Sequence, residues 1–253
     1  MRFSSLARLA LPAIALAAAM AASPAGAQQA TFSPEQKKAI ETLVRDYLIG
    51  NPEVLVEAMH ALEARQQEQA GAKAKAAIAA NAKALFDDGI SHVAGNPKGD
   101  VTLVEFFDYR CGYCKQVQPS IQALLKEDPK LRVVYKELPV LGPASVLASR
   151  AAIAALHLDK GAKYLAFHDL MMGFRGQLGE AEVFRMAAAA GLDPEKLKAG
   201  MAKPEVEQLI RANLDLAEKL GINGTPGFVI GNQLVPGAIP LETMRKLVQE
   251  ARG

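Results

Sequence analysis

The chain has 253 residues, with 29 basic and 27 acidic side chains and a formal net charge of +2. A balance this close to neutral offers no basic surface for a phosphate backbone, so we expect no nucleic-acid partner. The length allows one large domain or a domain with an appendage, and it is ample for a hydrophobic core.

The first residues have the pattern of a secretory signal. Arg2 and Arg8 precede an apolar run over residues 9–22, and Ala25-Gly26-Ala27 provides a cleavage site of small residues. Removing residues 1–27 takes two of the 29 basic residues and none of the 27 acidic ones, so 29 − 2 = 27 and the mature charge is near zero. We predict a signal peptide over residues 1–27 and a mature protein in the periplasm.

Residues 28–62 predict two short amphipathic helices. Ser33-Pro34-Glu35-Gln36 has the capping pattern of a helix start, and Asn51-Pro52-Glu53 begins a second helix. About 30 residues cannot enclose a core by themselves. Their apolar faces must pack on the main domain or on copies of themselves, and the second alternative predicts an oligomerisation region.

Residues 63–88 predict a helical or flexible linker. From Arg65 to Lys83 the sequence is rich in Gln, Ala and Lys, with hardly any large apolar residue before Ile78. If helical throughout, this spacer would hold the first two helices away from the main domain, since each helical residue adds about 1.5 Å. Gly71 leaves two alternatives open, a bend at that residue or one continuous helix.

Residues 89–253 predict a compact α/β domain. A nearly unbroken apolar run over residues 101–107 indicates a central strand, a helix follows from residue 111, and residues 131–136 form a second strand. This βαβ unit predicts parallel strands with a right-handed crossover. Helical patterns alone occupy residues 142–220 and predict an insertion, after which a hairpin over 228–235 and a final helix over 241–251 are expected.

Cys111 and Cys114 are the two cysteines of the chain. A disulfide across so short a loop would stabilise the fold little, because it hardly constrains the unfolded chain, so a redox or metal role explains the pair better. At the start of a helix, Cys111 faces free backbone N–H groups that stabilise a thiolate. We predict that the Cys111 thiolate forms a mixed disulfide with a substrate and that Cys114 resolves it.

Glu105 stands six residues before Cys111 on the apolar strand. Burying a carboxylate is costly, so this residue is expected to be protonated, paired or functional. One interpretation is a proton relay to Cys114, and the other is a solvated residue at a strand edge.

The segments Val104-Glu105-Phe106-Phe107, Cys111-Gly112-Tyr113-Cys114 and Gly224-Thr225-Pro226-Gly227-Phe228, with a helical insertion between them, resemble the DsbA-type thioredoxin superfamily. The resemblance implies a thioredoxin fold with an inserted helical domain. It also implies a cis Pro226 against the redox pair, with Thr225 and Pro226 as the substrate-docking edge and Gly112 and Tyr113 beside it. The Gly-Tyr pair and Thr225 resemble disulfide isomerases more than the strongly oxidising member.

The whole chain, with Asp46-Tyr47-Leu48 and Asn51-Pro52-Glu53-Val54-Leu55, is similar to the suppressor of copper sensitivity protein C (ScsC) group. That similarity implies a homo-oligomer, most simply a trimer, although fewer than two heptads are too short to specify the number. The expected substrates are misfolded or disulfide-containing exported proteins, and the expected partner is a membrane thiol reductase. No cofactor is expected apart from the redox-active disulfide Cys111-Cys114.

Three other functions remain open. A DsbA-type dithiol oxidase would use the same cysteines, and so would a copper-binding protein of copper tolerance, because two soft thiolates suit Cu(I). A redox-silent interaction module would use the helices instead. The four histidines show no ligand spacing with each other or with the cysteines, so no metal site is predicted.

Overall fold

The computed structural model describes residues 32–158 and 161–253, and the predicted signal peptide lies outside them. The chain divides into two units, residues 1–59 and residues 60–253. In the described part of the chain, no helix combines the length and apolar character that crossing a bilayer requires.

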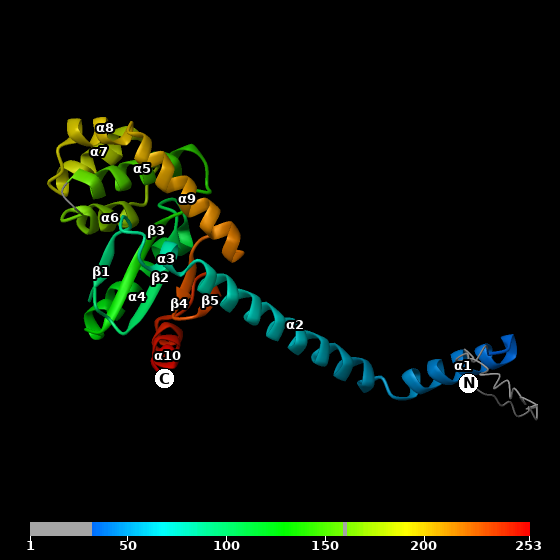
Figure 1. The fold of residues 1–253 in the computed structure, drawn as a ribbon. Coiled ribbons are helices and arrows are strands. Elements are labelled where there is room, and N and C mark those ends of the chain that lie inside the picture. Colours follow the sequence, from blue (N-terminus) through cyan, green and yellow to red (C-terminus); the bar gives the residue numbers. More distant parts are fainter. Residues whose placement is uncertain (1–31, 159–160) are drawn as a thin grey trace, which may run out of the picture. The chain divides into compact units, whose positions relative to one another are not determined.

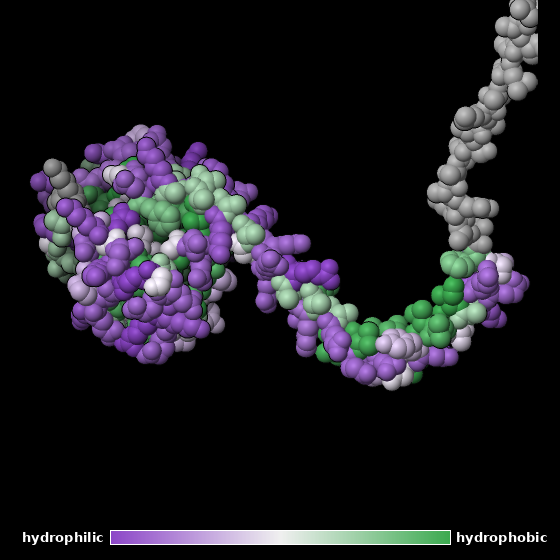
Figure 2. Space-filling model, turned by 60° about the horizontal axis from the view of Figure 1, so that its bottom comes forward, coloured by the Kyte–Doolittle hydropathy of each residue, from purple (hydrophilic) through white to green (hydrophobic). Residues whose placement is uncertain are grey.

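The described part of the first unit contains α1 (Pro34–Gly50) and the beginning of α2 (Glu53–Ala80). The predicted capping box is present, because Ser33 Oγ accepts a bond from the Gln36 N–H and the Gln36 side chain accepts one from the Ser33 N–H. The structure describes all of α1, and none of its residues is buried. Figure 2 shows apolar side chains gathered along this unit, and the large ones are Phe32, Ile40, Leu43, Val44, Tyr47, Ile49, Leu55, Val56 and Met59.

α2 continues into the second unit without interruption at Gly71, as the continuous-helix alternative requires. Its last turn belongs to a hydrophobic core, since Ile78 is buried there together with Leu85 of α3 (Ala82–Phe86). The sequence interpretation placed both residues in the linker, whereas the structure packs them on the sheet.

The second unit is built on a mixed five-stranded sheet with the order β1-β3-β2-β4-β5 (Figure 1). The strands are β1 (Val93–Gly95), β2 (Val101–Phe107), β3 (Leu131–Glu137), β4 (Gly227–Ile230) and β5 (Gln233–Pro236). β2 and β3 are parallel and joined through α4 (Gly112–Glu127), which confirms the predicted βαβ unit. The remaining pairs are antiparallel.

Alternation along β2 separates two cores, because successive side chains of a strand point to opposite faces. Leu103 and Phe107 join the core that contains α4 and α10 (Leu241–Arg252). Val104 and Phe106 join the core that contains Ile78 and Leu85, together with α9 (Pro204–Leu220). Glu105 therefore shares the face of α4, the helix that carries the cysteines.

The helical insertion lies between β3 and β4 (Figure 1) and contains α5 (Pro143–Leu158), α6 (Tyr164–Gly173), α7 (Glu180–Ala189), α8 (Pro194–Met201) and α9. We did not predict α8 as a separate helix. Its start is marked by Asp193, whose side chain accepts the N–H groups of Glu195 and Lys196, and by Pro194 in the first turn. Gly221 ends α9 with φ of 73°, a left-handed conformation that favours glycine.

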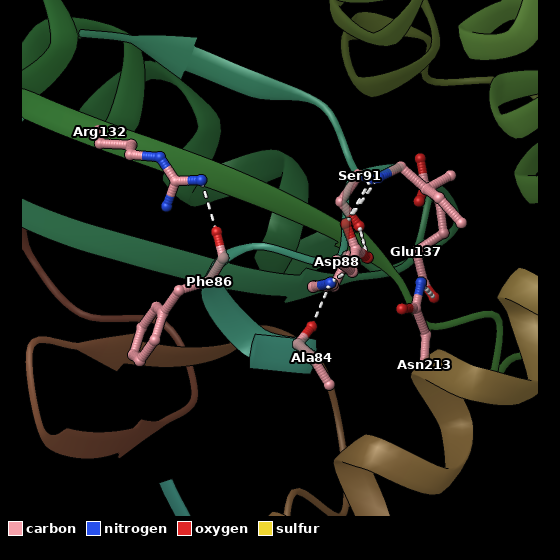
Figure 3. Close-up of polar contacts among 9 residues, drawn as sticks. Ala84, Phe86, Asp88, Ser91, Arg132, Glu137 and Asn213 are labelled. Carbon is pink, nitrogen blue, oxygen red and sulfur yellow. Dashed lines mark hydrogen bonds and ion pairs between the residues drawn. The ribbon is translucent and has the colours of Figure 1, made fainter. Parts of the chain in front are cut away.

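Two cations of β3 fasten α3 and the turn after it to the sheet (Figure 3). Lys136 Nζ donates to the Ala84 carbonyl at 2.7 Å and lies 2.6 Å from Asp88 Oδ2. Arg132 donates to the Phe86 carbonyl. Lys136 is fully buried, so its contacts with α3 and the following turn lie in the interior of the second unit.

Candidate functional site

The loop from β2 to α4 leads to Cys111 and Cys114 at the start of the helix and is held by Asp108. Asp108 is buried and its carboxylate accepts four hydrogen bonds, from the backbone N–H groups of Arg110, Val140 and Leu141 and from the Ser145 hydroxyl. These bonds tie the loop before Cys111 to the chain after β3. The sequence interpretation missed this residue, although an acid directly after a strand is a common turn former.

Cys111 is the N-cap residue of α4, with φ −70° and ψ 116°. Its Sγ lies 3.2 Å from the Thr225 carbonyl oxygen, to which the thiol donates when it is protonated. The pKa of Cys111 is lowered to about 5, first by a hydrogen bond from the Cys114 thiol and further by the Thr225 side chain and the backbone N–H groups of Cys114 and Tyr113. Helix-start N–H groups and neighbouring donors therefore stabilise the thiolate, as the sequence interpretation expected.

Cys114 lies one turn later and is fully buried. Its pKa is raised, first because its proton is held in the hydrogen bond to Cys111, then by burial and by the charge of Glu105. The two cysteines are not joined by a disulfide. The pair thus combines one ionised sulfur with one protonated sulfur, which is the arrangement that thiol–disulfide exchange requires.

Glu105 has 0 % exposure, so the strand-edge alternative does not hold. It pairs with Tyr135 of β3 and Phe228 of β4, and neither carboxylate oxygen has a hydrogen-bond partner among the described residues. Burial, followed by the negative charge of Cys111, raises the pKa of Glu105 to about 8. A carboxyl with this pKa can both release and accept a proton near neutral pH.

The loop before β4 brings Thr225 and Pro226 to the cysteines. The Thr225–Pro226 peptide bond is cis, as the resemblance implied, and Pro226 is buried while Thr225 is half-buried. A hollow of about 260 Å³ beside this loop is lined by residues 221–227 together with Leu234, Pro236 and Gly237. Gly112 and Tyr113, which follow Cys111 in the sequence, are exposed, Tyr113 to 66 %.

The histidines do not join the cysteines. Within residues 32–158 and 161–253, no group of three or more His, Cys, Asp or Glu side chains is placed to hold a metal ion. His168 is buried among aromatic rings and contacts the Tyr109 hydroxyl at 3.1 Å, while burial lowers its pKa to about 3.

A mixed sheet, a Cys-x-x-Cys pair at a helix start and a cis-proline loop against it define a thioredoxin-fold protein with an inserted helical domain. Residues 102–249 match the family of DSBA-like thioredoxin domains, and residues 36–69 match the copper resistance protein ScsC N-terminal domain. The chain therefore belongs to the DsbA-like thioredoxin family, which confirms the resemblance and the fold class.

Solved structures agree with this assignment. A thioredoxin-like oxidoreductase from Silicibacter pomeroyi DSS-3 is 46 % identical, with a TM-score of 0.64 over 67 % of this chain and 96 % of that one. Proteus mirabilis ScsC in a transitional conformation is 32 % identical, with a TM-score of 0.65 over 88 % of this chain and 98 % of that one.

The curated proteins that are similar to this chain include ion antiporters, in which the matching region is a part of a longer chain. Na(+)/H(+) antiporter NhaA 3 of Salinispora tropica is 30 % identical over 162 residues, which are 63 % of this chain and 24 % of the antiporter. The chain thus spans about a quarter of that protein's length. The thiol:disulfide interchange protein DsbA of Bordetella parapertussis is 24 % identical over 56 % of this chain and 68 % of its own length.

Proposed function

We propose that the protein is a periplasmic thiol–disulfide oxidoreductase that acts chiefly as a protein disulfide isomerase. The observation that carries the chemistry is the division of the two thiols into a Cys111 thiolate, with a pKa of about 5, and a protonated Cys114. At neutral pH Cys111 is ready to attack, while Cys114 keeps its proton until a mixed disulfide forms.

The reaction begins when the Cys111 thiolate attacks one sulfur of a substrate disulfide. A Cys111–substrate disulfide forms, and the second substrate sulfur leaves with the electron pair and takes up a proton. The displaced substrate thiolate attacks another disulfide of the same substrate, which forms a new pairing and displaces a further substrate thiolate. When a displaced thiolate attacks the substrate sulfur of the mixed disulfide, the bond to Cys111 breaks, Cys111 leaves as a thiolate, and the exchange consumes no net electrons. If the Cys114 thiol attacks Cys111 Sγ instead, it gives its proton to Glu105 and forms the Cys111-Cys114 disulfide, while the substrate sulfur leaves with the electron pair and the substrate is reduced.

Glu105 suits this role because it lies on the sheet face packed against α4 and has a pKa of about 8. The carboxylate form accepts the Cys114 proton during oxidation, and the carboxylic acid returns it during reduction. A membrane thiol reductase would reset the oxidised pair. Thr225 and Pro226 would dock an extended substrate beside Cys111, with Gly112 and Tyr113 on the other side.

Isomerase activity is supported by the exposed apolar surface of the first unit. Leu43 is 70 % exposed and Tyr47 is 56 % exposed, which is unfavourable for side chains of this size unless a partner covers them. We propose that copies of this chain associate with one another through this surface, most simply as a trimer. Several Cys111 thiolates would then reach one misfolded exported protein and favour shuffling over oxidation.

The test is refolding of a scrambled multi-disulfide protein, compared with oxidation of its reduced form, with molar mass measured by light scattering. Leu43→Glu places a charge in the apolar surface, and Thr42→Glu adds the same charge to an exposed polar position one residue away. We expect Leu43→Glu to lower the mass and the isomerase rate together, and Thr42→Glu to change neither. A monomeric wild type that only oxidises would contradict the isomerase proposal and favour an oxidase.

Copper handling is the second candidate, because the N-terminal match is described as a domain of a copper resistance protein. The two cysteines supply two soft ligands, which suit Cu(I) but not a closed zinc site. Titration with Cu(I), followed by the thiol-exchange assay, separates the two functions. A copper carrier would bind one equivalent of Cu(I) tightly, would lose this binding in the Cys111→Ser variant, and would show no isomerase activity.

A further inference from the structure

A second cavity, separate from the hollow beside Pro226, lies next to Cys111. It has a volume of about 660 Å³, and its lining includes Arg110, Gly112, Lys115, Pro143, Ala144 and Arg175. Arg110 and Gly112 are the two sequence neighbours of Cys111, so the cavity lies beside the residue that carries the reactive thiol, although Cys111 itself is not part of the lining. A volume of this order accommodates a side chain or a small ligand.

Three cations line this cavity, and we call Arg110, Lys115 and Arg175 the basic pocket. In the part of the chain that the structure describes, none of them forms an ion pair. Each donates instead to a backbone carbonyl oxygen, those of Leu141, Phe174 and Met172 respectively. Among the residues that the structure describes, no acidic side chain lines the cavity.

Asp108, the acid nearest in sequence, offsets the charge of the basic pocket only in part. Its carboxylate is buried and already accepts four hydrogen bonds, none of them from the side chains of the basic pocket. The three cations also repel one another. Burial is the largest cause of the lowered pKa of Lys115. The charge of Arg175 lowers this pKa further, the charge of Asp108 raises it, and the charge of Arg110 lowers it again, so the net shift is downward.

We propose that the basic pocket binds a carboxylate of the polypeptide substrate, an Asp or Glu side chain adjacent to the cysteine that Cys111 attacks. This inference rests on the proposed thiol-exchange function and assigns it a substrate preference. A bound carboxylate relieves the repulsion among the three cations, and its charge-assisted hydrogen bonds hold the substrate sulfur near Cys111. Substrates with an acidic residue beside their cysteine then react faster than neutral or basic ones.

The basic pocket does not alter which bonds form and break in the thiol–disulfide exchange, or where the electrons go. The Cys111 thiolate still attacks the substrate disulfide, the Cys111–substrate bond forms, and the displaced sulfur leaves with the electron pair and takes a proton from water. The pocket supplies Coulombic attraction, which raises the association rate and falls with ionic strength. Salt dependence is therefore a signature that a merely structural role of these cations would not produce.

The test uses the reduced full-length protein and three peptides, each with one cysteine linked by a disulfide to neutral 2-thiopyridine. The residue beside the cysteine is Glu, Gln or Lys, and release of 2-thiopyridone is followed by absorbance. We expect the Glu peptide to react roughly fivefold faster than the Gln peptide at low salt, with the ratio falling toward one at high salt. The Lys peptide should be the slowest.

Arg175→Gln should lower the Glu-to-Gln rate ratio roughly two- to threefold. Arg185→Gln is the matched control, since Arg185 is an exposed cation of the same helical insertion outside the cavity lining. A wild-type ratio near one, or a ratio that both variants leave unchanged, overturns the basic pocket as a substrate site. No release from any peptide overturns the thiol-exchange function itself, so the two failures are distinguishable.

Discussion

The thiols of Cys111 and Cys114, one helical turn apart on α4, have pKa values shifted in opposite directions by the same hydrogen bond. The Cys114 proton stabilises the Cys111 thiolate, and the thiolate in turn holds that proton. The Cys111 sulfur is therefore the nucleophile at neutral pH, and the Cys114 sulfur stays protonated until a mixed disulfide forms.

Removing the Cys114 thiol should raise the pKa of Cys111. Cys114→Ala deletes the largest cause of the shift, and a hydrogen bond to a charged group is worth about 1.5 to 3 kcal/mol, which corresponds to an increase of about 1 to 2 pKa units. The measurement is thiolate absorbance against pH in the reduced protein. Wild type should show a midpoint near 5. A wild-type midpoint near the ordinary thiol value would contradict the site described above.

Glu105→Gln should change how stability depends on pH. The folded pKa of Glu105 is raised from 4.5 to about 8, so the folded state binds the extra proton between these values and wild-type stability falls as pH rises through this window. The Glu105→Gln variant lacks this pH-dependent loss of stability. Relative to wild type it should gain about 3 kcal/mol between pH 5 and pH 8, measured by urea unfolding of both reduced proteins. Any cost of the buried amide is independent of pH, and parallel profiles would show that Glu105 keeps an ordinary pKa.

The same variant should slow the resolving step. In wild type, closure of the Cys111-Cys114 disulfide should accelerate as pH rises toward 8, because more Glu105 is ionised and able to accept the Cys114 proton. Glu105→Gln should slow closure by about tenfold or more and remove this acceleration. Stopped-flow measurement on a preformed mixed disulfide isolates the step. An unchanged rate and pH profile would assign Glu105 a structural role only.

Leu85→Ala should destabilise the second unit by about 2 to 5 kcal/mol, since Leu85 is fully buried in the core beneath α3. Ile90→Ala is the comparison, because Ile90 lies five residues later and is 45 % exposed, and its loss should cost well under 1 kcal/mol, roughly the value for surface positions. Equal unfolding midpoints for the two variants would mean that α3 is not part of the core.

Sequence patterns predicted the elements whose signals are local. The capping residues of α1, the apolar run of β2 and the Gly231-Asn232 turn between β4 and β5 each have a short-range cause, and the structure shows all three elements. The parallel pairing of β2 and β3 followed from the intervening helix. The cis peptide bond before Pro226 came from the family resemblance and not from the turn signal alone.

Features that depend on contacts distant in sequence were not predictable in this way. The sequence offered burial of Glu105 as one of two alternatives, and the decision between them depends on β3 and β4, which lie on both sides of β2. The four bonds to Asp108 come from residues up to 37 positions away. β1, three residues long, carries too little pattern to be recognised and forms through its pairing with β3.

Because Ile78 in the last turn of α2 and Leu85 of α3 are buried in the core beneath the sheet, another N-terminal segment has to be joined to this catalytic unit upstream of Ala77. A chimera joined at residue 89 would lose Ile78 and Leu85 and leave apolar side chains of β2 and α9 facing water. Other N-terminal segments can be attached ahead of this helical turn, provided that the turn itself is kept together with the sheet.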